Sequence, residues 1–222
     1  MLDKDGNEID HWTSVEGESH KIDSSKLIGG ETYILHEVLP PAKYSVAQDV
    51  SFTVNTEGKP QTVYMKDDAT KIQVTKTDIT GSKELGGAKL VVKDKNGNVV
   101  DSWESVEGET YIVEGKLIAG ETYTLHEEIP PEGYVVAKDV VFTVNMDGTP
   151  TRVQMKDETT KIHITKTDIT GDKELGGAKL VVKDKNGDVV DSWTSVEGET
   201  HIIEGKLTVV SDGTLWEVLT AL

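Results

Sequence analysis

Short stretches in which apolar and polar residues alternate occupy the middle of the chain. They are rich in Val, Ile, Thr and Tyr, and turn-forming residues separate them. Alternation with a period of two is typical of half-buried β-strands. No long helical period interrupts the series, so we expect an all-β sandwich. The pattern predicts strands at residues 71–78, 88–93, 99–105, 110–114, 122–127, 140–145 and 151–157.

Three of these strands place an ionisable residue at the end of their apolar face. Lys76, Glu127 and Asp157 each continue the spacing of the apolar residues before them. A buried charge is costly unless it is paired or neutralised. We therefore interpret one amine and two carboxyls as parts of a single buried site.

Turn signals between the apolar runs support the predicted strands. Asn96-Gly97 separates two apolar runs and predicts a two-residue hairpin, and Asp5-Gly6 and Asn186-Gly187 repeat the signal. Pro130-Pro131 cannot continue a strand and marks a loop.

The sequence repeats with a period of about 90 residues. Thr75-Lys-Thr-Asp-Ile-Thr-Gly81 returns as Thr165-Lys-Thr-Asp-Ile-Thr-Gly171. Such a period fits small all-β modules in tandem. We expect an N-terminally truncated module at 1–69, a complete module at 70–158 and a C-terminally truncated module at 159–222. The linkers are short, so neighbouring modules should form a fairly stiff rod.

The outer modules contain only part of the buried site. The first has Glu37 and Asp67 without a lysine strand, and the third has Lys166 and Glu217 without an acceptor strand. We expect both to be destabilised, with unpaired edges prone to strand exchange. An alternative is head-to-tail self-association, in which the Lys166 strand of one chain enters the first module of another.

Composition narrows the range of functions. The net charge of −17 argues against a nucleic-acid partner, and the absence of cysteine excludes disulfides. No apolar run is long enough for membrane insertion, and no signal peptide is recognisable, so an exported parent protein would contain this chain as an internal piece. Neither a metal site, nor a cofactor motif, nor a catalytic set for an external substrate is recognisable.

Three motifs in order carry a resemblance to a known family. They are Val74-Thr-Lys-Thr-Asp78, Tyr123-Thr-Leu-His-Glu127 with its Pro-Pro-Glu-Gly-Tyr134 turn, and Val153-Gln-Met-Lys-Asp157. Together they resemble the Cna B-type, or SpaA-like, repeat domains of Gram-positive surface proteins and pilins. The resemblance implies prealbumin-like β-sandwich modules of the reverse-immunoglobulin kind.

The resemblance also implies a spontaneous amide bond between Lys76 and Asp157, promoted by Glu127. These are the residues that strand alternation selects. Burial disfavours the charged forms, which would leave an amine nucleophile held against a carboxyl. The acceptor is Asp where Asn is commoner, so water would be the leaving group. The alternative is an ordinary salt-bridge cluster at a sheet edge.

Two functions follow as hypotheses. The first is a structural stalk or spacer on the bacterial cell surface or cell wall, in contact with neighbouring repeats of the same protein and without enzymatic turnover. The second is an adhesive module that binds a host matrix protein or glycan. Near-identical repeats favour the spacer, because loops tuned to one ligand would differ between copies.

Overall fold

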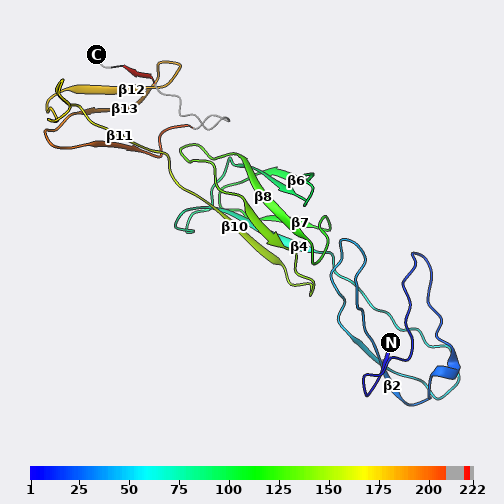
Figure 1. Ribbon diagram of the computed structural model, residues 1–222. Coiled ribbons are helices and arrows are strands. Elements are labelled where there is room, and N and C mark those ends of the chain that lie inside the picture. The colour runs from blue at the N-terminus through cyan, green and yellow to red at the C-terminus, as the bar shows by residue number, and fades with distance from the viewer. Residues whose placement is uncertain (209–217, 221–222) are drawn as a thin grey trace. The chain divides into compact units, whose positions relative to one another are not determined.

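The computed structural model describes residues 1–208 and the backbone of 218–220, and the all-β prediction is confirmed (Figure 1). Strands β1 to β15 are accompanied by one short 3-10 helix, η1 (Ser24–Lys26). Across these residues we find no helix with the length and apolar character that crossing a bilayer requires.

The middle repeat, residues 70–158, forms two sheets. One has the strand order β10-β4-β7, and the other has the order β6-β5-β8-β9. All seven predicted strands are present, with ends shifted by at most two residues. Their bounds are β4 (Lys71–Asp78), β5 (Lys89–Lys93), β6 (Val99–Glu104), β7 (Tyr111–Glu114), β8 (Thr122–Ile129), β9 (Val140–Thr143) and β10 (Thr151–Asp157).

The predicted alternation is visible in the burial of individual side chains. In β10 every second residue is buried, from Thr151 to Asp157, and the residues between them are exposed. In β4 and β8 the buried faces include Ile72 and Leu125, which have no exposed surface. Because successive side chains point to opposite faces, the same period that builds the core also carries the ionisable residues into it.

The turn between β5 and β6 differs from the predicted two-residue hairpin. Lys93 pairs with Val99, so residues 94–98 form a longer loop. The Asp94 carboxylate accepts hydrogen bonds from the backbone N–H groups of Asn96 and Asn98, both within 2.9 Å. This side-chain cap stabilises the wider turn, in which Gly97 has a φ of +83°.

The chain divides into two compact units. The first comprises residues 1–71, 114–121 and 144–151, and the second comprises 72–113, 122–143 and 152–222. The first unit contains one sheet, with the order β1-β2-β3. Its strands are β1 (Leu2–Asp3), β2 (Thr32–Leu35) and β3 (Val50–Thr53).

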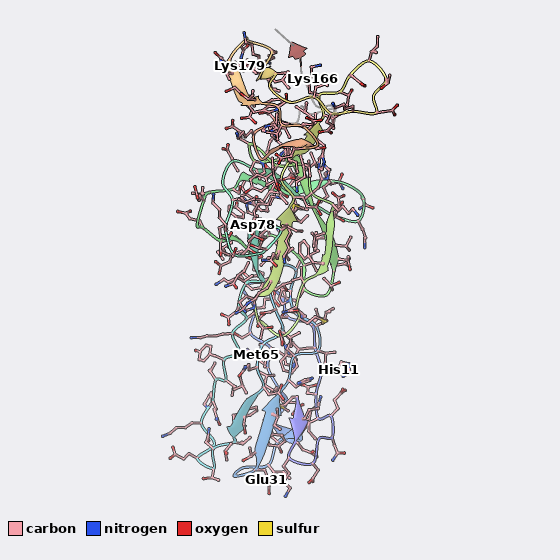
Figure 2. All side chains as sticks on the ribbon, turned by 90° about the vertical axis from the view of Figure 1, so that its left-hand side faces the viewer. His11, Glu31, Met65, Asp78, Lys166 and Lys179 are labelled. Atoms are coloured by element: carbon pink, nitrogen blue, oxygen red, sulfur yellow. The ribbon has the colours of Figure 1, made fainter. Side chains whose placement is uncertain are left out.

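A strand equivalent to β4 is missing from the first repeat, and the second sheet is missing with it. β4 is the central strand of its sheet, so β7 and β10 pair only with β4. Residues 63–67, which correspond in sequence to the end of β10, have no strand structure, and Figure 2 labels Met65 within this segment. Without a central strand the flanking segments have no backbone partner.

The third repeat keeps parts of both sheets. β11 (Lys161–Ile164) pairs with β14 (His201–Glu204), and β12 (Lys179–Lys183) pairs with β13 (Val189–Thr194) and β15 (Val218–Thr220). β11 corresponds to β4 but ends at Ile164, whereas β4 continues to Asp78. Lys76 lies in the part of β4 that has no strand counterpart in the third repeat, so Lys166 falls outside β11.

The core of the middle repeat provides a test of this packing. We expect Leu125→Ala to lower the free energy of unfolding by about 2–5 kcal/mol, because Leu125 is fully buried and its removal leaves a cavity. Val141 lies on the neighbouring strand β9, and 67% of its surface is exposed. Val141→Ala should therefore change the free energy of unfolding by less than about 0.5 kcal/mol. Urea unfolding of both variants measures the contrast, and equal losses would contradict the assigned core.

Candidate functional site

Three strands bring the predicted site residues together in the interior of the middle repeat. Lys76 lies on β4 and Asp157 lies on the adjacent β10 of the same sheet, whereas Glu127 comes from β8 of the other sheet. Their exposed fractions are 2%, 0% and 1%. The structure thus places the amine and both carboxyls in one buried location.

The amine contacts both carboxyls. Lys76 Nζ donates a hydrogen bond to Asp157 Oδ1, and Glu127 Oε1 lies 2.9 Å from the same nitrogen as an ion pair. The second oxygen of Asp157, Oδ2, is buried and accepts no hydrogen bond from the residues that the structure describes. One oxygen of the Asp157 carboxyl therefore contacts the amine, and the other oxygen can still accept a proton.

Glu127 is held in place by a backbone group. Its Oε2 accepts a hydrogen bond of 2.7 Å from the N–H of Ala137, which follows the Pro-Pro loop. This donor was not among the residues predicted from sequence, because any non-proline residue carries a backbone N–H. A signal was nevertheless present, since alanine recurs ten positions after both Glu37 and Glu127.

Burial changes the protonation of the acceptor. It raises the pKa of Asp157 from its ordinary value of 3.8 to about 6, against the opposing effect of the Lys76 ammonium, and Glu127 adds to the increase. Two carboxylates beside one ammonium would leave an uncompensated negative charge in an apolar interior. The site therefore favours a proton on one of its carboxyls.

This arrangement fits both interpretations made from sequence. A buried ion-pair cluster uses the same contacts, but its desolvation cost offsets much of its Coulombic gain. Condensation of the amine with the carboxyl removes both charges and needs an amine, an activated carboxyl and a proton shuttle in contact. The three side chains have those types and that proximity.

The first repeat retains one part of the site in the same setting. Glu37 Oε2 accepts a hydrogen bond of 2.7 Å from the N–H of Ala47, as Glu127 does from Ala137. Asp67 is only partly buried and lies in the segment without strand structure. The structure therefore does not place Asp67 as it places Asp157.

The third repeat does not assemble its site within the described residues. Lys166, labelled in Figure 2, lies beyond the end of β11, is partly buried, and donates to the neighbouring Thr167 carbonyl oxygen at 3.3 Å. Glu217 lies outside the residues that the structure describes. Throughout residues 1–208 no group of three or more His, Asp or Glu side chains is arranged to hold a metal ion.

Comparison with known proteins identifies the class of the middle segment. The profile of the SpaA prealbumin-like fold domain matches residues 70–159. This segment is therefore a prealbumin-like domain of the SpaA type, and the resemblance drawn from its three motifs is confirmed. A search of curated proteins finds no match.

The chain is also similar to several solved structures of low sequence identity. The Bacillus anthracis TIE protein is 20% identical, with a TM-score of 0.45 over 85% of this chain and 39% of its own. Shaft pilin SpaA from Lactobacillus rhamnosus GG is 18% identical, with a TM-score of 0.35 over 59% and 65%. The Streptococcal ancillary pilin is 16% identical, with a TM-score of 0.35 over 87% and 68%. The chain thus spans less than two thirds of the first two proteins.

The raised pKa of Asp157 generates a prediction about stability. In Lys76→Met the ammonium that lowers this pKa is absent, so the folded chain holds the proton of Asp157 more tightly than the unfolded chain does. Stability is then present at low pH and is lost as pH rises from near 4 through about 6 and beyond. We expect a loss on the order of 1 kcal/mol per pH unit in this window.

Urea unfolding of Lys76→Met at about pH 5 and about pH 8 measures this loss, with Lys166→Met as the matched control. The control should show no comparable loss over the same interval. Equal or greater stability of Lys76→Met at the higher pH would refute the assigned burial of the carboxyl.

Proposed function

We propose that the chain is part of a structural stalk or spacer whose middle repeat is cross-linked by an amide bond between Lys76 and Asp157. One observation carries the proposal: the amine contacts the carboxyl in a site where all three side chains are at most 2% exposed. Fixed proximity replaces the entropy of a bimolecular encounter, so no external enzyme is needed.

The reaction balances within the three residues. One carboxyl of the site already holds a proton, and a second proton passes from the ammonium to the other carboxylate, which gives a neutral amine and two carboxylic acids. Nζ of Lys76 then attacks Cγ of Asp157, while protonated Glu127 donates to a carboxyl oxygen of Asp157. Glu127 takes a proton from the attacking nitrogen and passes it to a hydroxyl of the tetrahedral intermediate, which leaves as water when the C–O bond breaks, and the remaining hydroxyl proton returns to Glu127. The products are one amide and one water, without buried charge.

The bond would stabilise the repeat through its loop length. It joins residues 81 positions apart, from the first strand of the middle repeat to its last. Loop-closure entropy for that length gives about 4.5 kcal/mol. The chain has no cysteine, so this cross-link would act in place of a disulfide and would resist reductants.

The proposed setting is the surface of a Gram-positive bacterium, in contact with further repeats of the same kind. The SpaA-type domain supports this setting, and the solved structures similar to the chain include a shaft pilin and an ancillary pilin. The reaction occurs once per molecule, so the proposal involves no turnover of an external substrate.

Intact-mass measurement of the purified chain tests the bond directly. We expect the sequence mass minus one water, because a single amide forms. Lys76→Ala, Asp157→Ala and Glu127→Ala should each have the full sequence mass, since each removes one reacting or promoting group. Peptide mapping should recover residues 76 and 157 in one linked peptide.

Lys166→Ala is the matched control for this experiment. It removes the equivalent lysine of the third repeat and should still lose one water. Denaturing gels of the unmodified chain distinguish the intramolecular bond from head-to-tail linkage, which would give covalent dimers that disappear in Lys166→Ala. A full-mass monomer in the unmodified chain would exclude the proposed cross-link.

A further inference from the structure

A buried threonine lies where the middle repeat meets the third. Thr160 precedes β11, and its exposed fraction is 1%. Its N–H donates to the Gly133 carbonyl oxygen at 2.8 Å, and its own carbonyl oxygen accepts from the Gly205 N–H at 2.8 Å. Its hydroxyl lies 3.1 Å from the carbonyl oxygens of both Gly133 and Leu207. One residue therefore binds a loop of the middle repeat and a turn of the third.

The same arrangement occurs 90 residues earlier. Thr70 is 3% exposed, and its N–H donates to the Lys43 carbonyl oxygen at 3.0 Å. Its hydroxyl donates to the Leu117 carbonyl oxygen at 2.7 Å, and its carbonyl oxygen accepts from the Gly115 N–H at 2.9 Å. All these residues belong to the first compact unit, and those around Thr160 belong to the second.

The junction at Thr160 is packed closely enough to require glycine. A Cβ added to Gly133 would lie 2.4 Å from the Gly205 carbonyl oxygen, and the backbone at Gly133 has a φ of +83°. The corresponding residue at the first junction is Lys43, which has a φ of +74° and is the one non-glycine residue with positive φ among those described. The conformation of this loop is thus kept at both junctions, even where a side chain makes it strained.

A buried hydroxyl that bridges two carbonyl oxygens has a consequence for stability. If either partner segment unfolds, Thr160 loses polar partners in a site that excludes water. Loss of the loop at Gly133 removes the acceptor of its N–H and one hydroxyl contact, and loss of the turn at 205–207 removes the donor to its carbonyl oxygen and the other hydroxyl contact. Ordinary linkers avoid this cost because water solvates their backbone.

We infer that Thr70 and Thr160 are joints that couple the folding of consecutive repeats, and that residue 133 and residues 205–207 are the two sides of the joint at Thr160. The coupling stabilises a third repeat whose own sheets are incomplete in the described residues. It does not require the amide bond, so it extends beyond the proposed function.

Hydrogen exchange of the full chain, followed by mass spectrometry, tests the joint. In Thr160→Val the shape is kept and the hydroxyl is lost, and we expect amides of β11 and β14 to exchange about tenfold faster or more. Amides of β5 and β8 should stay within about twofold of the unmodified chain. Thr159→Val is the matched control, because its hydroxyl also bonds to the third repeat, at Glu204 Oε1, but in an exposed position.

Two further variants separate the joint from general damage. Thr160→Ser restores the hydroxyl and should return exchange in β11 and β14 to near the original rate. Gly133→Ala should accelerate exchange of the β11 and β14 amides while the side chain of residue 160 remains threonine. If Thr160→Val leaves β11 and β14 unchanged, accelerates β5 equally, or is matched by Thr159→Val or Thr160→Ser, the joint is refuted. Intact masses of the same samples report the amide bond separately.

Discussion

The ammonium of Lys76 lies between two carboxyls in an interior that excludes water, and β4 is the strand that puts it there. β4 pairs with β10 on one side and β7 on the other, so the same backbone supports the sheet and presents the amine to Asp157. The first repeat shows what depends on this strand. In this repeat Glu37 still accepts a hydrogen bond from the N–H of Ala47, but the second sheet is absent from the described residues, and Asp67 lies in a segment without strand structure.

Much of the middle repeat could be predicted because one periodicity governs both its core and its site. The period of two that buries Ile72 and Leu125 also buries Lys76 and Glu127, so strand positions and site residues follow from the same pattern. An ionisable residue in an apolar series is costly, which makes it visible against its neighbours. The three motifs then linked those positions to a known domain type.

The parts that could not be predicted depend on backbone groups and on local competition between turns. The N–H of Ala137 holds Glu127, but a backbone donor has no distinctive side chain. Residues 94–98 form a longer loop than the predicted two-residue turn because the Asp94 carboxylate accepts hydrogen bonds from two backbone amides. The dipeptide Asn-Gly alone does not distinguish between these two turns. Thr70 and Thr160 look like ordinary linker residues until their hydrogen-bond partners are known.

The position of the two joints determines how such an array would carry tension. Thr70 is close to Lys76 in sequence, and Asp157 is close to Thr160. With the amide in place, a pull applied along the chain would pass through residues 70–76, cross the new bond and leave through residues 157–160. Residues 77–156 would lie outside this path and would bear almost none of the force. The sheets could then remain folded under loads that separate ordinary strand pairs.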